Sequence, residues 1–275
     1  MMINTNDIID PVQIENRYAI FSTYKNDFVF GRENIKNPIF CGGIIKSISQ
    51  NVYNFKINEN IGYISCKQRP DLTLSANQIV KIAFNNRKLI AVLPYASYAM
   101  KILRHINPSL NQNIAVVKIN FFSILLERLI KLSGANVFLI DSKDDSEFIF
   151  DFDNEAKKLN EVAIATIIYH SLTPKVNEFI SKINCIQKID LNNISLYDKG
   201  LNDNNYIKGV KYPFSYVRWD YKKNLEYFVN LIKKDVINLD FLDIEYIEVN
   251  NLNDIYKQIN AREKNLKLFK IIENN

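Results

Sequence analysis

The chain has 275 residues, of which 47% are hydrophobic, enough to bury one large core or two modest ones. Its 35 basic and 30 acidic residues are interspersed without a basic block, so nucleic acid is not an expected partner. No stretch approaches the roughly 18 apolar residues of a membrane span, and the start MMINTNDIIDPVQIEN lacks the features of a signal peptide, which predicts a cytoplasmic protein without a membrane partner.

The first part of the chain is predicted to be rich in β-strands. Between Tyr18 and Lys81, short runs such as YAIFSTY, IGYISC and QIVKIA alternate apolar and polar residues, as strands do. Asn is common at the turn positions, and it tolerates a positive φ better than other residues with a side chain. The turns between the strands are expected at 34–38, 58–60 and 68–71. We therefore expect a small β-rich domain over residues 1–94.

The segment over residues 95–211 begins with a predicted helix and a strand–helix–strand unit. The helix is expected from Tyr95 to Arg104, before Asn107-Pro108. The sequence NIAVVKINFFSILLERLIKLSGANVFLID, residues 113–141, then has an apolar strand, an apolar helix and a second strand. Gly134 stands where a left-handed C-terminal cap of that helix belongs.

The alternation continues after this unit. The polar run 142–147 predicts a loop, and a helix at 175–182 is expected between strands at 162–169 and 185–189. Strands and helices that interleave in this way predict an α/β fold with a doubly wound parallel sheet.

The last segment, residues 212–275, has a different pattern. Residues Tyr221 to Lys233 form a predicted amphipathic helix with one apolar face. It is followed by a predicted strand at 244–249, a helix at 252–261 and a strand at 266–272.

Several stretches in order resemble the medium-chain dehydrogenase/reductase family, which includes the zinc-type alcohol dehydrogenases. The sequence from Gly43 to Ile61 is similar to the family pattern GxVxxVGxxVxxFxxGDxV, with Asn58-Glu59 in place of Gly-Asp. The residues from Asn111 to Asp141 fall on its nucleotide-binding unit. The segment KYPFSYVRWDYKKNLEYFVNLIKK resembles the pattern YPxSYVRWxxxRNxExFxxLIxxG, found in the zinc-dehydrogenase half of bi-domain oxidoreductases from bacterial polysaccharide gene clusters.

This resemblance implies a GroES-like β-rich domain, a shortened Rossmann-like domain after it, and a tail that returns to the first domain. It also implies an oxidoreductase that moves hydride between a nicotinamide and a hydroxyl or carbonyl carbon, acting in the synthesis of a surface glycan or modified sugar. The substrate would be a sugar or nucleotide sugar, and a homodimer is the expected assembly.

The family's zinc site is not expected in this chain. The zinc-ligating position of its Gly-His-Glu motif falls on Ile39, with Phe40 in the Glu position, and such side chains cannot ligate a metal. The three cysteines, Cys41, Cys66 and Cys185, have neither zinc spacing nor the spacing of a disulfide framework. A zinc-independent protein is therefore predicted.

The glycine-rich turn of the nucleotide-binding unit is also changed. In GxGxxG, glycines permit the bend, the approach of the pyrophosphate and the packing of helix on strand. Their positions carry Lys118, Asn120 and Ser123 here. Ser123 is a mild change, whereas the Asn120 side chain is expected to project into the diphosphate space. Lys118 offers a cation near phosphate, at a position whose backbone is expected to suit Gly better.

Asp141 ends the second strand, where an acidic residue would accept the ribose hydroxyls of NAD. It favours NAD over NADP, with Lys143 as a counter-argument. An Asp at the end of a buried strand also simply begins many turns.

Three other residues are candidates for a role in chemistry or binding. His170 follows a predicted strand end and is a candidate acid/base, beside a plain structural role. Arg218 and Trp219, from the Tyr-Val-Arg-Trp match, suit an anionic or sugar-like ligand, or else anchor the tail helix.

Two hypotheses of different classes follow. The first is a zinc-independent, NAD- or NADP-linked oxidoreductase of glycan or sugar biosynthesis. The second is a pseudoenzyme: a non-catalytic binding or assembly subunit that has lost cofactor binding and serves a partner oxidoreductase or transferase. The changed turn and the missing zinc ligand favour the second hypothesis, and Asp141 favours the first.

Overall fold

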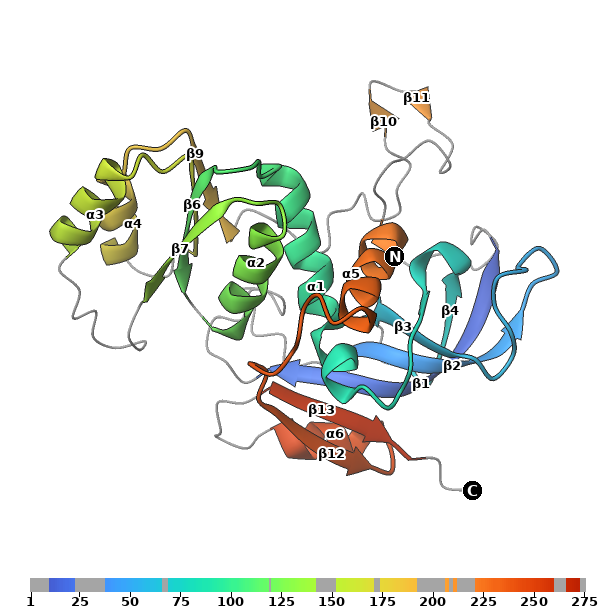
Figure 1. Cartoon of the computed structure of the whole chain (residues 1–275). Coiled ribbons are helices and arrows are strands. Elements are labelled where there is room, and N and C mark those ends of the chain that lie inside the picture. The colour runs from blue at the N-terminus through green and yellow to red at the C-terminus, as the bar shows by residue number, and fades with distance from the viewer. Residues whose placement is uncertain are drawn as a thin grey trace. The chain divides into compact units, whose positions relative to one another are not determined.

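The computed structural model describes residues 10–22, 38–65, 69–118, 120–141, 152–170, 174–191, 206–207, 210–211, 221–259 and 266–272. The chain divides into two compact units, Met1–Ser97 with Gly200–Asn275, and Tyr98–Lys199 (Figure 1). The boundary predicted after residue 94 is close to the first division, and the one predicted after 211 falls within the second segment of the first unit. Among the described residues, no helix is long and apolar enough to cross a membrane.

The first unit is built on a seven-stranded, mostly antiparallel sheet with the order β12-β13-β1-β2-β3-β5, in which β4 also pairs with β1. Its strands are β1 (Pro11–Ser22), β2 (Ile39–Ile48), β3 (Asn60–Ser65), β4 (Asp71–Ser75), β5 (Val80–Lys81), β12 (Ile244–Val249) and β13 (Leu266–Ile271). The last strand of the chain therefore joins the first, with Ile20 opposite Leu268. The end of the chain therefore lies in the same sheet as its first strand.

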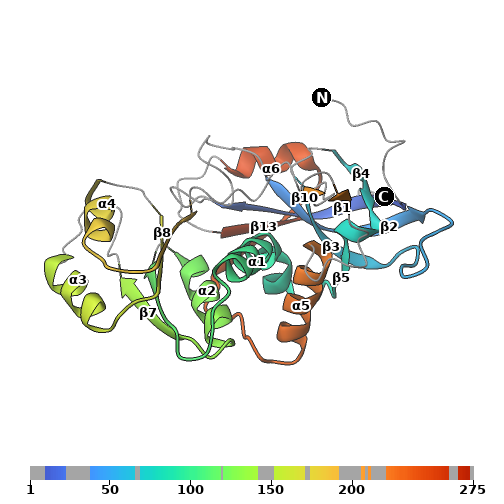
Figure 2. The same cartoon turned by 90° about the horizontal axis from the view of Figure 1, so that it is seen from above.

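Two helices of the tail cover this sheet. Figure 2 shows α6 (Leu252–Ile259) on one face and α5 (Tyr221–Lys233) on the other. Ile255 of α6 is fully buried in the core of the sheet, with Ile14, Phe40 and Phe269. On the other side, Lys222 of α5 donates a hydrogen bond to the Ala76 carbonyl at 3.1 Å, in the short helix η2 (Ala76–Gln78). The amphipathic pattern of the tail helix thus predicted its bounds and its burial correctly.

Helix α1 (Arg87–Ile106) begins earlier than the Tyr95 start predicted from the sequence. Asn86 precedes it, and its side-chain oxygen accepts a hydrogen bond from the Leu89 N–H at 2.8 Å, which satisfies one of the donors that a helix start leaves open. Pro94 lies inside the helix. The predicted start was therefore wrong, because the helix accommodates Pro94 and extends back to Arg87.

The second unit contains a parallel four-stranded sheet of order β7-β6-β8-β9. Its strands and helices are β6 (Asn113–Lys118), α2 (Phe121–Lys131), β7 (Asn136–Asp141), α3 (Phe152–Glu161), β8 (Thr166–Tyr169), α4 (Pro174–Ser181) and β9 (Gln187–Asp190). The order confirms the predicted α/β class and the doubly wound parallel sheet. A further pair, β10 (Tyr206–Ile207) and β11 (Val210–Lys211), is antiparallel.

Helices lie on both faces of the parallel sheet (Figure 1). Ala115 and Val117 of β6 contribute to a core that also contains Leu159 of α3 and Phe179 of α4. Ile114 and Val116 alternate with them and are equally buried, on the face that α2 covers. The continuous apolar character of β6 is explained by this cover on both sides.

Two details of the second unit can be compared with the prediction: the end of α2 and the start of β8. Gly134 has the left-handed φ that was predicted, +81°, but it lies two residues beyond the C-cap of α2, which is Leu132 in the right-handed conformation. The strand predicted from Val162 begins only at Thr166, because Val162 and Ala163 form a turn in which Ala163 has a φ of 56°. Helix α3, which occupies the preceding residues, was not predicted.

Candidate functional site at the carboxyl ends of the parallel strands

The topology of the second unit defines a switch point. The chain passes from β6 through α2 to β7 on one side, and from β7 through α3 to β8 on the other side of β6. In open α/β sheets, ligands bind outside the carboxyl ends of the strands where the strand order reverses in this way. The switch point of this sheet lies between β6 and β8.

The structure brings four of the predicted site residues to this edge of the sheet. Lys118 and Asp141, the last residues of β6 and β7, are direct partners in the parallel register. Val116 of β6 pairs with Ile168 of β8, so His170 comes just past the same edge. Asn120 follows β6 immediately before α2. Of the side chains of Lys118 and Asp141 nothing further is described.

Asn120 is the N-cap residue of α2. Its side-chain oxygen Oδ1 accepts a hydrogen bond from the Phe122 N–H at 2.9 Å, and its carbonyl oxygen accepts one from the Ser123 N–H at 3.1 Å. The first turn of a helix carries N–H groups without partners inside the helix, and these groups are what a phosphate binds. Asn120 therefore already supplies acceptors to two of them.

The backbone at the first two glycine positions, Lys118 and Asn120, does not require glycine. Asn120 has φ −162° and ψ −163°, an extended conformation open to any residue. Lys118 continues the extended strand β6 and is not among the residues of positive φ. The expectation that the backbone at position 118 suits Gly better is therefore wrong, because Lys118 is still part of the extended strand.

Ser123 stands at the third glycine position and faces the interior. It is 1% exposed, and its hydroxyl donates a hydrogen bond to the Val117 carbonyl at 3.4 Å. The side chain thus fills the space between α2 and β6 that a glycine would leave open. Close packing of helix on strand is kept with a small polar residue in place of glycine.

These observations test whether the turn fits a dinucleotide. A pyrophosphate bound in the usual way would need the N–H groups of the first turn of α2 and the space beside them. The Asn120 side chain takes the Phe122 N–H and occupies that position. The residues present do not fit this mode of binding. Sequence reasoning considered Asn120 only as a missing glycine; the signal it missed is that Asn directly before an apolar helix is a preferred N-cap.

His170 is placed at the edge but is buried. The residue is 5% exposed and directly follows β8. Its neighbour Tyr169 pairs with Asp190 across β8 and β9, and burial together with the Asp190 charge raises the Tyr169 pKa. With so little of the residue exposed, His170 would have to exchange a proton through the groups around it and not directly with solvent. The acid/base role of His170 stays a prediction.

The positions of the family's zinc site lie in the core of the first unit. Ile39 is 1% exposed and Phe40 is fully buried, both in β2. Burial also raises the pKa of the neighbouring Cys41 thiol well above its usual range, which disfavours the thiolate that a metal needs. Within the part of the chain that is described, no group of three His, Cys, Asp or Glu side chains could hold a metal ion. Cys66 lies outside that part, as do Arg218 and Trp219.

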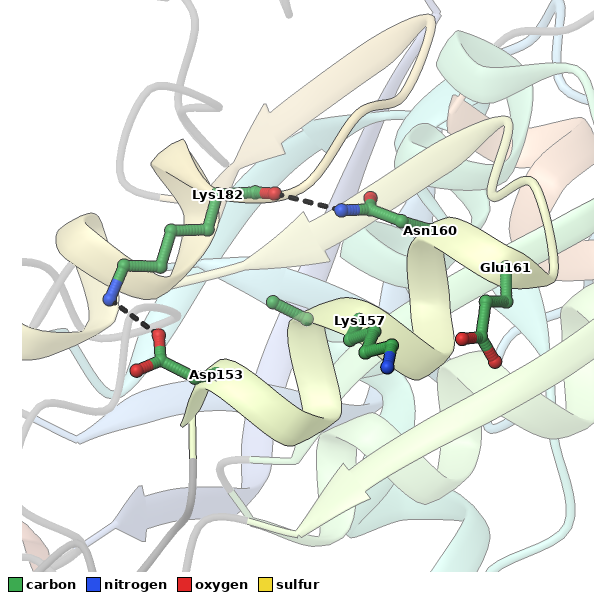
Figure 3. A pocket seen from close by; sticks show the side chains of 6 residues that line it. Asp153, Lys157, Asn160, Glu161 and Lys182 are labelled. Atoms are coloured by element: carbon green, nitrogen blue, oxygen red, sulfur yellow. Dashed lines mark hydrogen bonds and ion pairs between the residues drawn. The ribbon is translucent and has the colours of Figure 1, made fainter.

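A second surface feature lies away from the predicted site residues. An open hollow of about 520 Å³ is lined by α3 and by the residue after α4 (Figure 3). Lys182 forms an ion pair with Asp153 at 2.8 Å, and the Asn160 amide donates a hydrogen bond to the Lys182 carbonyl at 3.0 Å. Asn160 also accepts a hydrogen bond from the Asn184 N–H. The hydrogen bonds of Asn160 therefore hold the connection between α4 and β9. We assign no ligand to the hollow.

Comparisons with known proteins agree with this architecture. No protein-family model and no curated protein sequence matches the chain. Among solved structures, galactitol-1-phosphate dehydrogenase from Escherichia coli superposes with a TM-score of 0.64 at 10% identity, over 98% of this chain and 95% of that one. An alcohol dehydrogenase from Thermus sp. ATN1 gives 0.63 at 8% identity, over 99% and 96%. Escherichia coli quinone oxidoreductase, complexed with NADPH, gives 0.58 at 11% identity, over 98% and 94%.

These neighbours are medium-chain dehydrogenases/reductases, and the likeness shows that the chain has their fold. The first unit corresponds to the GroES-like β-rich domain and the second to the Rossmann-like domain, as the sequence resemblance implied. At such low identity the likeness extends to the fold alone. Activity depends on the site and not on the fold.

Proposed function

We propose that this chain is a dehydrogenase-fold binding or assembly subunit that does not hold a dinucleotide at its switch point. The observation that carries the proposal is the Asn120 cap, which takes a hydrogen-bond donor that a pyrophosphate would need. In the first unit, the buried Ile39 and Phe40 stand at the positions of the family's zinc motif and cannot ligate a metal, which also supports the proposal. Its partner would be an oxidoreductase that carries out the chemistry itself.

A second candidate is a zinc-independent oxidoreductase linked to NAD or NADP. It is favoured by Asp141, which ends β7 where a ribose hydroxyl would be accepted, and by the fold of a neighbour that is complexed with NADPH. A bound nicotinamide would supply hydride chemistry, and the chain would bind and orient it. The resemblance of the Tyr212–Ile232 segment directs this candidate to surface-glycan or modified-sugar synthesis, with a sugar or nucleotide sugar as substrate and a homodimer as assembly.

Titration of the purified chain with NADH and NADPH distinguishes the two candidates. Binding is followed by nicotinamide fluorescence and by thermal stabilisation, because a ligand that binds only the folded state raises its melting temperature. The first proposal expects neither signal at millimolar cofactor. Saturable binding that an Asp141→Ala variant loses would overturn it in favour of the oxidoreductase.

A further inference from the structure

We propose that the Asn120 side chain is a built-in substitute for the phosphate, and that its removal opens the start of α2 to a dinucleotide. The inference rests on the proposed function, since it assumes that the unaltered chain binds no dinucleotide there. It assigns the block to one residue and not to the loss of the whole glycine-rich turn. Asn120 is then the residue that determines affinity at the switch point.

The first argument is that the Asn120 cap uses a backbone N–H that a phosphate would need. Oδ1 of Asn120 lies 2.9 Å from the Phe122 nitrogen, a normal hydrogen-bond length. A phosphate oxygen would satisfy the same N–H, and it would gain more from the positive end of the helix because it is charged. The Asn120 carboxamide nevertheless keeps the Phe122 N–H, because it is part of the chain and lies beside that N–H at every ligand concentration.

The second argument is that α2 does not depend on the cap for its place. Its inner face is anchored by residues that are 1% exposed or less: Phe122, Leu125, Leu126, Leu129 and Ile130. Ser123 adds a hydrogen bond to β6. Loss of one capping side chain therefore leaves the helix on the sheet, and the N–H groups at its start stay aimed at the same point.

The third argument is that glycine fits at position 120. The extended φ and ψ of Asn120 are open to glycine. Glycine is also a tolerated N-cap, so the Asn120→Gly change costs little helix stability compared with a change to Ala. An Asn120→Asp change is the matched control: it keeps a capping oxygen on the same side-chain shape and adds a negative charge that repels phosphate.

The experiment titrates the full chain and the N120G and N120D variants with NADH, and in parallel with inorganic pyrophosphate. Fluorescence and thermal stabilisation report the dinucleotide, and stabilisation alone reports pyrophosphate. We expect N120G to bind NADH at least about tenfold more tightly than the unaltered chain, and N120D to bind no better, because only N120G removes both the capping oxygen and its steric block. Circular dichroism confirms that each variant is folded.

The outcomes separate this inference from the proposed function. If the unaltered chain shows no binding and folded N120G also shows none, the inference is overturned and the proposed function stands. If the unaltered chain binds NADH as tightly as N120G does, both are overturned. Binding by N120D equal to that by N120G would also overturn the inference, because the cap would then be irrelevant.

Discussion

Gly43 of β2 pairs with Asn16 of β1 and leaves no room for a side chain. A Cβ atom added to Gly43 would collide with the Glu15 carbonyl oxygen and would lie 2.7 Å from Cγ2 of Ile14. The adjacent Gly42 has more room, since its nearest neighbour would be the Tyr18 ring at 3.2 Å. The two glycines therefore form a matched pair in one strand.

We expect Gly43→Ala to destabilise the protein by about 2–3 kcal/mol, because a backbone oxygen cannot move aside without breaking the sheet register. Gly42→Ala should cost less, since its nearest contacts, Cδ2 and Cβ of Tyr18 at 3.2 and 3.3 Å, need to give way by only a few tenths of an ångström. Thermal or urea denaturation of both variants measures the difference. Equal losses would contradict the steric argument.

The raised pKa of Tyr246 predicts how the stability of the protein changes at alkaline pH. Burial raises its pKa to about 12, with Tyr18 and a hydrogen bond to Glu248 acting in the same direction and Arg87 opposing them. The Arg87 guanidinium lies 3.6 Å from the ring centre. A pKa raised above the value of 10.0 in the unfolded chain means that the folded state holds the proton more tightly, which stabilises it below pH 10.

This contribution is lost as the pH rises from 10 to about 12. The unaltered chain should therefore lose stability more steeply over that range than a Tyr246→Phe variant, which has no proton to lose. Between pH 7 and pH 9 the stability difference between the two should be constant. Denaturation midpoints measured across the range test this, and parallel curves throughout would exclude the coupling.

At the scale of elements, β13 is the strand that joins the tail of the chain to the sheet of the first unit. It lies between β12 and β1, with Phe269 opposite Ala19 on one side and Ile247 on the other. Phe269 is fully buried in the core of the first unit, whereas the next residue, Lys270, forms an exposed ion pair with Glu248 at 3.2 Å. Neighbouring positions in one strand thus point to core and solvent.

Phe269→Ala is expected to cost about 3–5 kcal/mol, the range for truncating a buried aromatic ring. Lys270→Ala should cost less than about 1 kcal/mol, as exposed ion pairs generally do. Denaturation of the two variants at the same pH and salt concentration measures both. A similar small loss in each would mean that β13 is not an interior strand of the folded protein.

The elements that the sequence predicted well are those with a clear period. The bounds of α5 and β12 agree with the prediction: apolar residues recur at helical spacing along α5, and β12 is rich in the Ile, Tyr and Val that strands favour. Helix α3 was missed because FDNEAKKLNE is mostly polar and only Ala156 and Leu159 are described as buried in it. Their burial comes from packing against α4 and the sheet, which a single sequence does not reveal.

The sequence predicts the parallel sheet that places the candidate residues, but not the contacts of their side chains. The alternation of strands and helices predicts the parallel sheet, and the backbones of Lys118, Asn120, Asp141 and His170 lie at its carboxyl edge. What the sequence could not give is the hydrogen bond of the Asn120 side chain, because the choice between projecting into a cavity and capping a helix depends on its rotamer. Asn58, Asn107 and Asn111 do show positive φ, as the abundance of Asn at turns suggested.

At the scale of the whole molecule, the second unit is one continuous segment inserted between two segments of the first. Each unit has a core of its own. Their strand pairs differ greatly in separation along the chain: Ala115 pairs with Phe138 in the second unit, whereas Ile20 pairs with Leu268 in the first. Closing a longer loop costs more chain entropy, and contacts distant in sequence slow folding.

The parallel sheet should therefore form before the antiparallel sheet is completed. In refolding followed by pulsed hydrogen exchange, the amides of β6 and β7 are expected to become protected earlier than those of β1 and β13. Phe179 and Phe269, each 1% exposed or less in its own core, provide matched variants. Phe179→Ala should slow the early phase, and Phe269→Ala should leave it unchanged while it weakens the late one. Simultaneous protection of both sheets would show that the inserted unit cannot fold ahead of the unit that surrounds it.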